Sequence, residues 1–293
     1  MKNRLSTTLC AFWAFVALLS LLPVGLRAQT EGLRERQAVD TLLAAPSARA
    51  RFVSRATLYG VGAANMYDTY LSPQEYRGVE VRVLRENLRF TPWGDGKWSR
   101  QVLFQGYVNY THNHVDNNNS VGLLGSWGYG VHRHFRLTPN FRLLAGGMAD
   151  LNGGFLWNMR NGNNPASARA YVNLGVSGMA VWDLKIRRYP IRLRYQLNVP
   201  LAGVMFSPHY GQSYYEIFSL GNAGGVVRFT SLHNQPSLRQ LLTADLPAGR
   251  AKLRLAYVWD AQQSSLNGIR THAYSHVFMV GLVREFYLLR GRR

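Results

Sequence analysis

The chain has 293 residues, of which 17% are charged and 12% aromatic, and it contains 28 glycines and 16 tyrosines. This combination excludes an intrinsically disordered chain, which needs many charges and few aromatic residues. It also argues against a mainly helical protein, whose surface would be rich in charged helix formers.

The first 28 residues have the order of a signal peptide. Lys2 and Arg4 supply positive charge, residues 9–22 form an apolar stretch, and Ala28 lies in a suitable position for cleavage. This order is typical of a secretory signal. We therefore predict cleavage after Ala28, followed by a periplasmic lead-in over residues 29–50. An uncleaved membrane anchor is the alternative.

Cleavage would change two properties of the chain. Cys10 is the single cysteine and would leave with the signal, so the mature chain would have no thiol, no disulfide and no cysteine metal site. Three basic residues would also leave, which lowers the formal net charge from +19 to +16. For an exported protein, this charge predicts outer-membrane lipids as partners, including anionic lipids or saccharides. No nucleic-acid-binding motif accompanies the charge, so we expect no nucleic-acid partner.

From about residue 52 onward, apolar and polar residues alternate along extended stretches. In residues 191–199, for example, the apolar Leu193, Tyr195 and Leu197 alternate with polar or charged residues. Alternation of this kind indicates β-strands with one apolar and one polar face. We predict ten strands, over residues 53–66, 78–90, 98–111, 120–136, 141–157, 168–186, 191–203, 237–246, 251–260 and 272–288.

The predicted strands are long for a soluble domain, where strands average about five or six residues. A tilted strand that crosses a bilayer needs about 9–11 residues. Together with the export signal, this length predicts an all-β fold: an antiparallel transmembrane β-barrel over residues 51–293, in the outer membrane of a Gram-negative bacterium. Residues 225–231 could supply part of an extra hairpin and raise the count to twelve. A soluble barrel with an apolar interior is the alternative to the membrane barrel.

The connections between the predicted strands alternate in length. Short, turn-rich links occur at residues 91–96, 137–140, 187–190 and 247–250. Longer polar links occur at residues 67–77, 112–119, 158–167, 204–236 and 261–271. Short periplasmic turns and longer external loops are typical of outer-membrane barrels, and an even strand number places both ends of the barrel in the periplasm.

Charged residues fall on the polar faces of the predicted strands, so we expect them to line the lumen. Buried charges must be paired or stay hydrated. They therefore predict either a salt-bridged interior that makes the barrel rigid or a narrow, anion-preferring passage. The predicted lumen residues are Glu80, Arg82, Asp150, Asp183, Arg192, Arg194, Lys252, Arg254 and Asp260.

The longest link contains the candidate chemistry. His209 and Ser213 are close in sequence and would be the base and nucleophile of a hydrolase, provided that they lie within hydrogen-bond reach. The alternative is a loop that packs its aromatic residues against the barrel mouth, and we favour it because no rigid third group orients the imidazole. The predicted packing residues are His209, Tyr210, Tyr214, Tyr215 and Phe218.

A metal site is the second chemical candidate. His112, His114 and Asp116 are side chains of the type that bind zinc. No further strong ligand follows these residues in the sequence, because the next residues are asparagines. We interpret this segment as a hydrated loop tip, and we predict no metal and no cofactor.

Two segments resemble a known family. Residues 206–221, with Gln212-Ser213-Tyr214-Tyr215-Glu216 at their centre, and residues 253–260 are similar to an uncharacterised, domain-of-unknown-function family of exported proteins from Bacteroidota. The resemblance implies an outer-membrane barrel and brings no known activity or catalytic residue. We therefore expect a non-enzymatic barrel with a structural, binding or narrow-passage role. The alternative is an outer-membrane hydrolase that acts on lipid or peptide with a site in residues 204–224.

Overall fold

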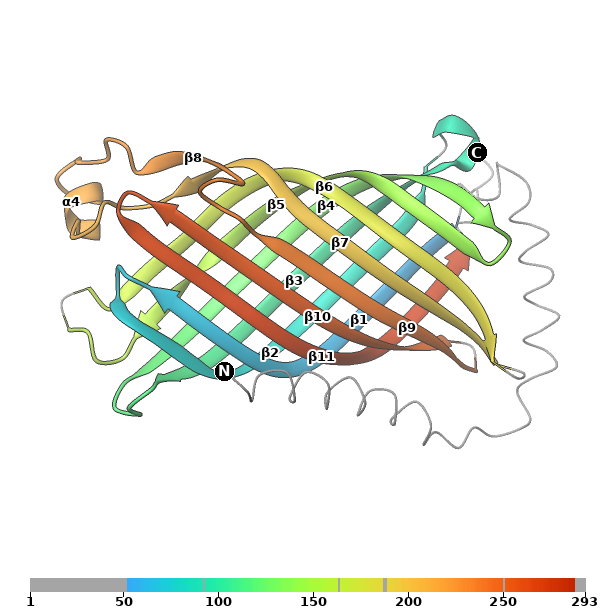
Figure 1. The fold of residues 1–293 in the computed structure, drawn as a ribbon, viewed down its shortest axis with the longest axis horizontal. Coiled ribbons are helices and arrows are strands. Elements are labelled where there is room, and N and C mark those ends of the chain that lie inside the picture. Colours follow the sequence, from blue (N-terminus) through green and yellow to red (C-terminus); the bar gives the residue numbers. More distant parts are fainter. Residues whose placement is uncertain (1–51, 92, 163, 187–188, 250, 288–293) are drawn as a thin grey trace, which may run out of the picture. The chain divides into compact units, whose positions relative to one another are not determined.

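The computed structural model describes residues 52–91, 93–162, 164–186, 189–249 and 251–287, which form one antiparallel sheet that closes on itself (Figure 1). The predicted signal peptide and lead-in lie outside the described residues. Within the described part of the chain, no helix is long and apolar enough to cross a membrane.

Strands dominate the described residues. They are β1 (Phe52–Asp68), β2 (Ser72–Phe90), β3 (Trp98–Asn113), β4 (Asn119–Thr138), β5 (Phe141–Asn158), β6 (Ala166–Ile186), β7 (Tyr189–Phe206), β8 (Val227–Ser231), β9 (Leu238–Ala248), β10 (Ala251–Leu266) and β11 (Ile269–Tyr287). A 3-10 helix, η1 (Trp93–Gly96), follows β2, and a short helix, α4 (Tyr214–Phe218), precedes β8.

Ten of the strands in the described residues form the closed wall. Each of β1 to β6 pairs with the next strand, β7 pairs with β9, and β10 and β11 lead back to β1. β8 pairs with residues 202–206 of β7, next to the stretch of β7 that pairs with β9. It is a short strand in addition to these ten. The ten-strand prediction is therefore confirmed. The twelve-strand alternative is wrong, because residues 225–231 supply one added strand and no hairpin of the wall.

The barrel has two different ends (Figure 1). The connections after β2, β4, β6 and β9 lie at one end, which we call the turn end, together with Phe52 and Tyr287. The connections after β1, β3, β5, β7 and β10 lie at the opposite end, which we call the loop end. The long connection between β7 and β9, which contains α4 and β8, belongs to the loop end.

Two of the predicted long links are tight turns in the structure. The link predicted at 261–271 shrinks to Asn267 and Gly268, because β10 and β11 continue pairing up to the Leu266–Ile269 pair. Both turn residues have positive φ, at 50° and 77°, as the favoured two-residue hairpin turn requires. The link predicted at 67–77 shrinks to residues 69–71. The sequence concealed these strand ends because both faces of a strand become polar where it extends beyond the lipid.

The outer wall is apolar and the inner wall is largely polar. Side chains on one face of neighbouring strands form a directly paired row: Phe104, Trp127, Leu151, Val172, Val204 and Phe229. Each of them is between 43% and 63% exposed. Gln101, Gln105 and Asn109 on the opposite face of β3 are buried inside the barrel. Apolar side chains outside and polar side chains inside are the arrangement of a membrane barrel, so the soluble alternative is wrong.

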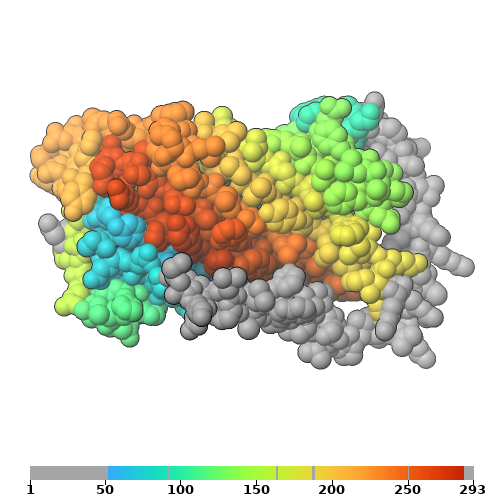
Figure 2. Space-filling view, viewed as in Figure 1, coloured from blue at the N-terminus to red at the C-terminus, as the bar shows by residue number. Residues whose placement is uncertain are grey.

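Much of the wall that faces the viewer in Figure 2 is formed by β7 and by β9 to β11. Inside the wall, Leu58, Leu84, Val258 and Val277 are fully buried and form an apolar cluster with their neighbours. The interior is thus packed with side chains from the strands themselves, as in other narrow barrels.

We expect Leu174→Arg to destabilise the barrel by about 2–4 kcal/mol, because Leu174 lies in the middle of β6 and its side chain is 63% exposed on the lipid-facing wall. The matched control is Tyr210→Arg, since Tyr210 is 69% exposed on the loop between β7 and α4, where we expect a change within about 0.5 kcal/mol. Urea unfolding in lipid vesicles measures both. Equal losses of stability in the two variants would contradict the assignment of Leu174 to the lipid-facing side.

Candidate functional site

The predicted lumen charges all lie on inward-facing positions of the barrel wall. Glu80 and Arg82 have no exposed surface, and Arg194, Arg254 and Asp260 are buried. Asp183, Arg192 and Lys252 are partly buried near the turn end. The structure brings these residues together in separate groups, which differ in depth and in partners.

Arg82 is the centre of the first group. Its Nε donates to Glu80 Oε1 at 2.7 Å, and its Nη1 donates to Asp260 Oδ2 at 3.3 Å. The guanidinium also lies 4.2 Å from the centre of the Tyr107 ring, a favourable cation–π arrangement. Arg239 donates to the same oxygen of Asp260 at 3.1 Å. Two cations and two carboxylates from three strands therefore compensate each other in the middle of the barrel.

Glu86 is the centre of the second group. It accepts hydrogen bonds from Arg194 at 2.8 Å and from Arg254 and Gln101. Arg254 in turn donates from Nη2 to Asp245 at 2.8 Å. Two arginines thus face two carboxylates in a buried, charge-balanced arrangement, in which hydrogen bonds to charged groups are strong.

The third group lies closer to the turn end and is less buried. Asp183 accepts from Arg192 at 2.6 Å and from Arg142 at 2.9 Å. Glu285 accepts from Lys252 at 2.6 Å. The side chains of this group keep between 22% and 36% of their surface. Partial hydration weakens these ion pairs compared with those in the middle of the barrel.

Asp150 lies beside the first group without forming an ion pair at salt-bridge distance. No ion pair links it to a described cation, and its Oδ1 is buried without a hydrogen-bond partner. It borders a cavity of about 30 Å³ together with Asn173 and Arg239, which is large enough for one or two water molecules. Asp150 thus lies near Arg239 without a hydrogen bond to it, because Arg239 donates to Asp260.

The sequence analysis missed several members of these groups. Glu86 has the same parity along β2 as Glu80 and Arg82, so it faces the same side. Arg239 and Asp245 face inward from β9 in the same way. Parity along the strand would have identified all three. The partners of Glu86 could not be identified in this way, because Arg194 and Arg254 lie on strands that are distant from β2 in the sequence.

The loop between β7 and β8 is built around a helix cap. Ser213 is the N-cap of α4: its Oγ accepts from the Glu216 N–H at 3.2 Å, and Glu216 Oε2 accepts from the Ser213 N–H at 2.9 Å. This reciprocal arrangement is a capping box. The His209 ring contacts Gly224 O through Nε2 at 3.3 Å. The sequence neighbours His209 and Ser213 therefore make different contacts, and neither makes a described hydrogen bond to the other's side chain.

The aromatic residues of this loop divide into two sets. Tyr214 packs against the rings of Tyr70 and Phe206, and its hydroxyl accepts from the Ala168 N–H at 2.6 Å. Burial raises the pKa of the Tyr70 phenol to about 12, and the phenol donates to Gln212 O at 2.8 Å. Ile217, which the sequence analysis did not select, is the buried residue of α4.

The other predicted packing residues are exposed. Tyr210, Tyr215 and Phe218 keep 69%, 65% and 73% of their surface, and His209 is exposed as well. Phe218 stacks on Tyr214 from its outer side, with ring centres 6.3 Å apart. Phe218 also stacks on Phe206 of β7, with ring centres 6.3 Å apart. Tyr214 and Phe218 thus make ring contacts with the wall, whereas His209, Tyr210 and Tyr215 are exposed.

The metal candidate does not assemble among the described residues, where no group of three or more potential ligands converges. His112 points outward from β3, and Asp116 lies in the following turn with a φ of 54°. Asn113 organises this turn by accepting from the N–H groups of Asn117 and Asn118. The segment is a hydrogen-bonded asparagine turn at the loop end.

Comparison with known sequences identifies the family. The model of the family described as "Protein of unknown function (DUF3316)" matches residues 14–293. The chain belongs to this family. The resemblance to a family of unknown function is thereby confirmed. A search of curated protein sequences gives no match.

Solved outer-membrane barrels have a similar arrangement of strands. The outer membrane protease OmpT from Escherichia coli is 9% identical, with a TM-score of 0.44, over 81% of this chain and 97% of OmpT. The transport unit of the autotransporter AIDA-I from Escherichia coli is 8% identical, with a TM-score of 0.47, over 82% and 90% of the two chains. The translocator domain of NalP from Neisseria meningitidis is 10% identical, with a TM-score of 0.40, over 88% and 98%. Similarity at this level carries no argument about activity.

We expect Glu86→Gln to destabilise the barrel by about 3–5 kcal/mol, because it leaves buried arginines without one of their two carboxylates. The matched control is Glu75→Gln, which breaks an exposed pair with Arg77 near the loop end, where we expect a loss of at most about 1 kcal/mol. Denaturant unfolding in the same detergent measures both. Similar values for the two variants would show that the interior is hydrated.

Proposed function

We propose that the mature chain, released by cleavage near Ala28, is a non-enzymatic barrel of the Gram-negative outer membrane with a closed lumen. Its role is structural or binding, and it is exerted at the loop end, which faces the outside. The observation that carries this proposal is the interior of the barrel, where fully buried, ion-paired side chains fill the space between the walls.

The buried interior argues against the narrow-passage alternative. Side chains that line a water-filled channel keep part of their accessible surface. Glu80, Arg82, Gln101, Gln105 and Gln196 keep none. Moving an ion through this region would require the partners of Arg82 and Glu86 to separate, and a buried charge without its partner is costly.

The loop geometry argues against the hydrolase alternative. A nucleophilic serine needs a base within hydrogen-bond reach and a third group that orients the base. In this loop, Ser213 and Glu216 form the cap of α4, and His209 contacts a backbone carbonyl. Ser213, Glu216 and His209 therefore make contacts that support the structure of the loop and do not form a catalytic arrangement.

The partners we propose are outer-membrane lipids, including anionic lipids or saccharides. The chain carries 34 basic and 15 acidic residues, and most of the described carboxylates of the wall are used in ion pairs. Basic residues at the loop end, such as Arg228 and Arg270, are exposed and carry no described carboxylate partner. Positive charge is thus left over for anionic partners.

Single-channel recording tests the closed lumen. The protein is purified from the outer-membrane fraction, checked for heat-modifiable gel migration, and reconstituted into planar bilayers beside a known porin. We expect no stepwise conductance from the folded barrel, because its interior is filled. Conductance steps whose ion selectivity changes in Arg82→Gln would contradict the closed lumen. Recovery of the protein in the soluble periplasm would contradict the location.

Hydrolysis assays test the absence of catalysis. Ser213→Ala and His209→Ala are compared with the parent protein on phospholipid and peptide substrates. We expect no turnover above background in any of the three proteins. Turnover by the parent that both substitutions abolish, while the gel migration of the folded barrel is kept, would favour the hydrolase instead.

A further inference from the structure

A groove opens in the barrel wall at the loop end, beside β8. β9 begins at Leu238 and pairs with β10 only as far as Ala261, so the last residues of β10 extend beyond it. β8 pairs with β7 along one edge, and no strand of the described residues pairs with its other edge. The space between β8 and the end of β10 is a groove of about 550 Å³, within the range of small-molecule sites.

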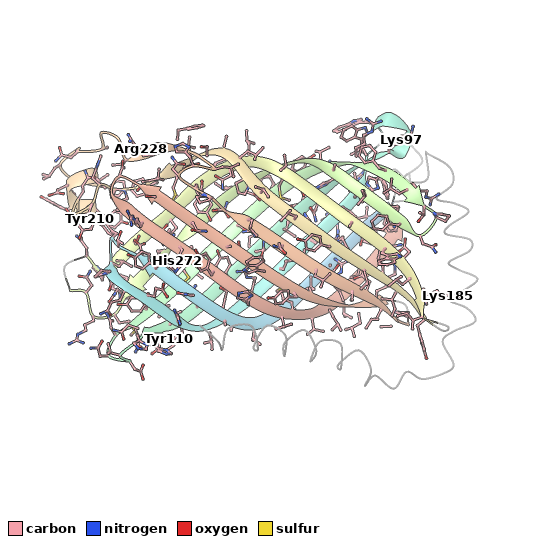
Figure 3. All side chains as sticks on the ribbon, viewed as in Figure 1. Lys97, Tyr110, Lys185, Tyr210, Arg228 and His272 are labelled. Atoms are coloured by element: carbon pink, nitrogen blue, oxygen red, sulfur yellow. The ribbon has the colours of Figure 1, made fainter. Side chains whose placement is uncertain are left out.

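The groove is polar and basic. Arg228 and His233 line it, and no carboxylate does. Arg228 forms no ion pair among the described residues, and Figure 3 shows it at the loop end, opposite Lys97 and Lys185 at the turn end. His233 contacts Ser231 through Nδ1, which leaves its Nε2 without a described partner. An arginine without a partner beside a histidine favours a phosphate or another compact anion.

Two asparagines of the groove hold its walls in place. Asn267 Nδ2 donates to Ser207 O at 2.6 Å and to Gly225 O at 3.0 Å, which ties the β10–β11 turn to the residues on either side of the α4 loop. Asn234 Nδ2 donates to Phe229 O at 3.0 Å, and the Ser265 N–H donates to Asn234 O at 2.8 Å. The groove is therefore held in place by hydrogen bonds, and its ionisable side chains are Arg228 and His233.

The outer side of the groove continues the lipid-facing wall. Phe229 pairs with Val204, and Val204 pairs with Val172. These three residues are the last members of the exposed apolar row that begins at Phe104. Phe229 and Val227 are 63% and 64% exposed. A molecule in this position would contact hydrocarbon-facing side chains on one side and a basic, water-exposed groove on the other. An amphiphile with an anionic head group would make both the apolar and the basic contacts.

We propose that this groove binds a phosphate of a phosphorylated glycolipid of the outer leaflet. The Arg228 guanidinium and the His233 imidazole hold the phosphate, the volume of the groove accommodates the attached sugar, and the acyl chains lie along Phe229 and Val204. The proposal rests on the outer-membrane location proposed above, because only there does the loop end meet the outer leaflet.

Binding of purified lipid A to the detergent-purified full-length barrel tests the proposal by native mass spectrometry. We compare the parent protein, the double variant Arg228→Gln with His233→Gln, and the control Arg160→Gln, which changes an exposed arginine in the β5–β6 loop. We expect the double variant to weaken binding at least about tenfold and the control to change it less than about twofold, since the head group contributes through charge-assisted hydrogen bonds. Heat-modifiable migration verifies that each variant is folded.

Three further probes identify the ligand class. Dephosphorylated lipid A, glucosamine 1-phosphate without acyl chains, and phosphatidylglycerol should each bind at least about tenfold more weakly than lipid A. Unchanged binding in the double variant, or equal binding of any of these probes, would overturn the proposal. Membrane fractionation distinguishes the two proposals. Absence of the barrel from the outer membrane would refute the proposed function. An outer-membrane barrel without selectivity for lipid A would refute only the proposed lipid site in the groove.

Discussion

The closure of the sheet is the constraint on which the rest of this structure depends. Backbone N–H and C=O groups have no water partner in hydrocarbon, so a sheet can cross a membrane only when it has no free edge there. β1 and β11 satisfy this condition by pairing from Phe52–Tyr287 to Asp68–Thr271 without a shift in register. Closure through ten strands of the described residues also fixes a narrow lumen, which strand side chains can fill.

The filled lumen decides what the interior charges do. An inward side chain in a narrow barrel loses its water, and a charge that loses water must gain a partner. Arg82 and Glu86 meet this requirement with carboxylates and guanidinium groups from other strands. Apolar residues such as Leu58 and Val277 fill the remaining volume. The interior is thus a rigid core, and recognition is left to the two ends and to the outer wall.

The loop end differs from the rest of the wall because β9 is short. β7 has 18 residues and β9 has 11, so the outer part of β7 needs another partner. β8 supplies it, but β8 has five residues and lies apart from the end of β10. The mismatch in strand length produces both the free edge of β8 and the basic groove beside it. α4, with its capping box, connects β7 to β8 above this region.

The sequence by itself determined the fold class, the strand number and the facing of most residues. The reason is that alternation is a local property: Asn173 and Leu174 face opposite sides whatever their neighbours are. It did not determine where strands end beyond the lipid, because both faces are polar there, as between Ala261 and Leu266. Only the tertiary structure decided which charges pair, since Arg82 and Asp260 are 178 residues apart. It also decided that Tyr214 packs while Tyr215 is exposed, because the orientation of a short helix depends on the wall against which it lies.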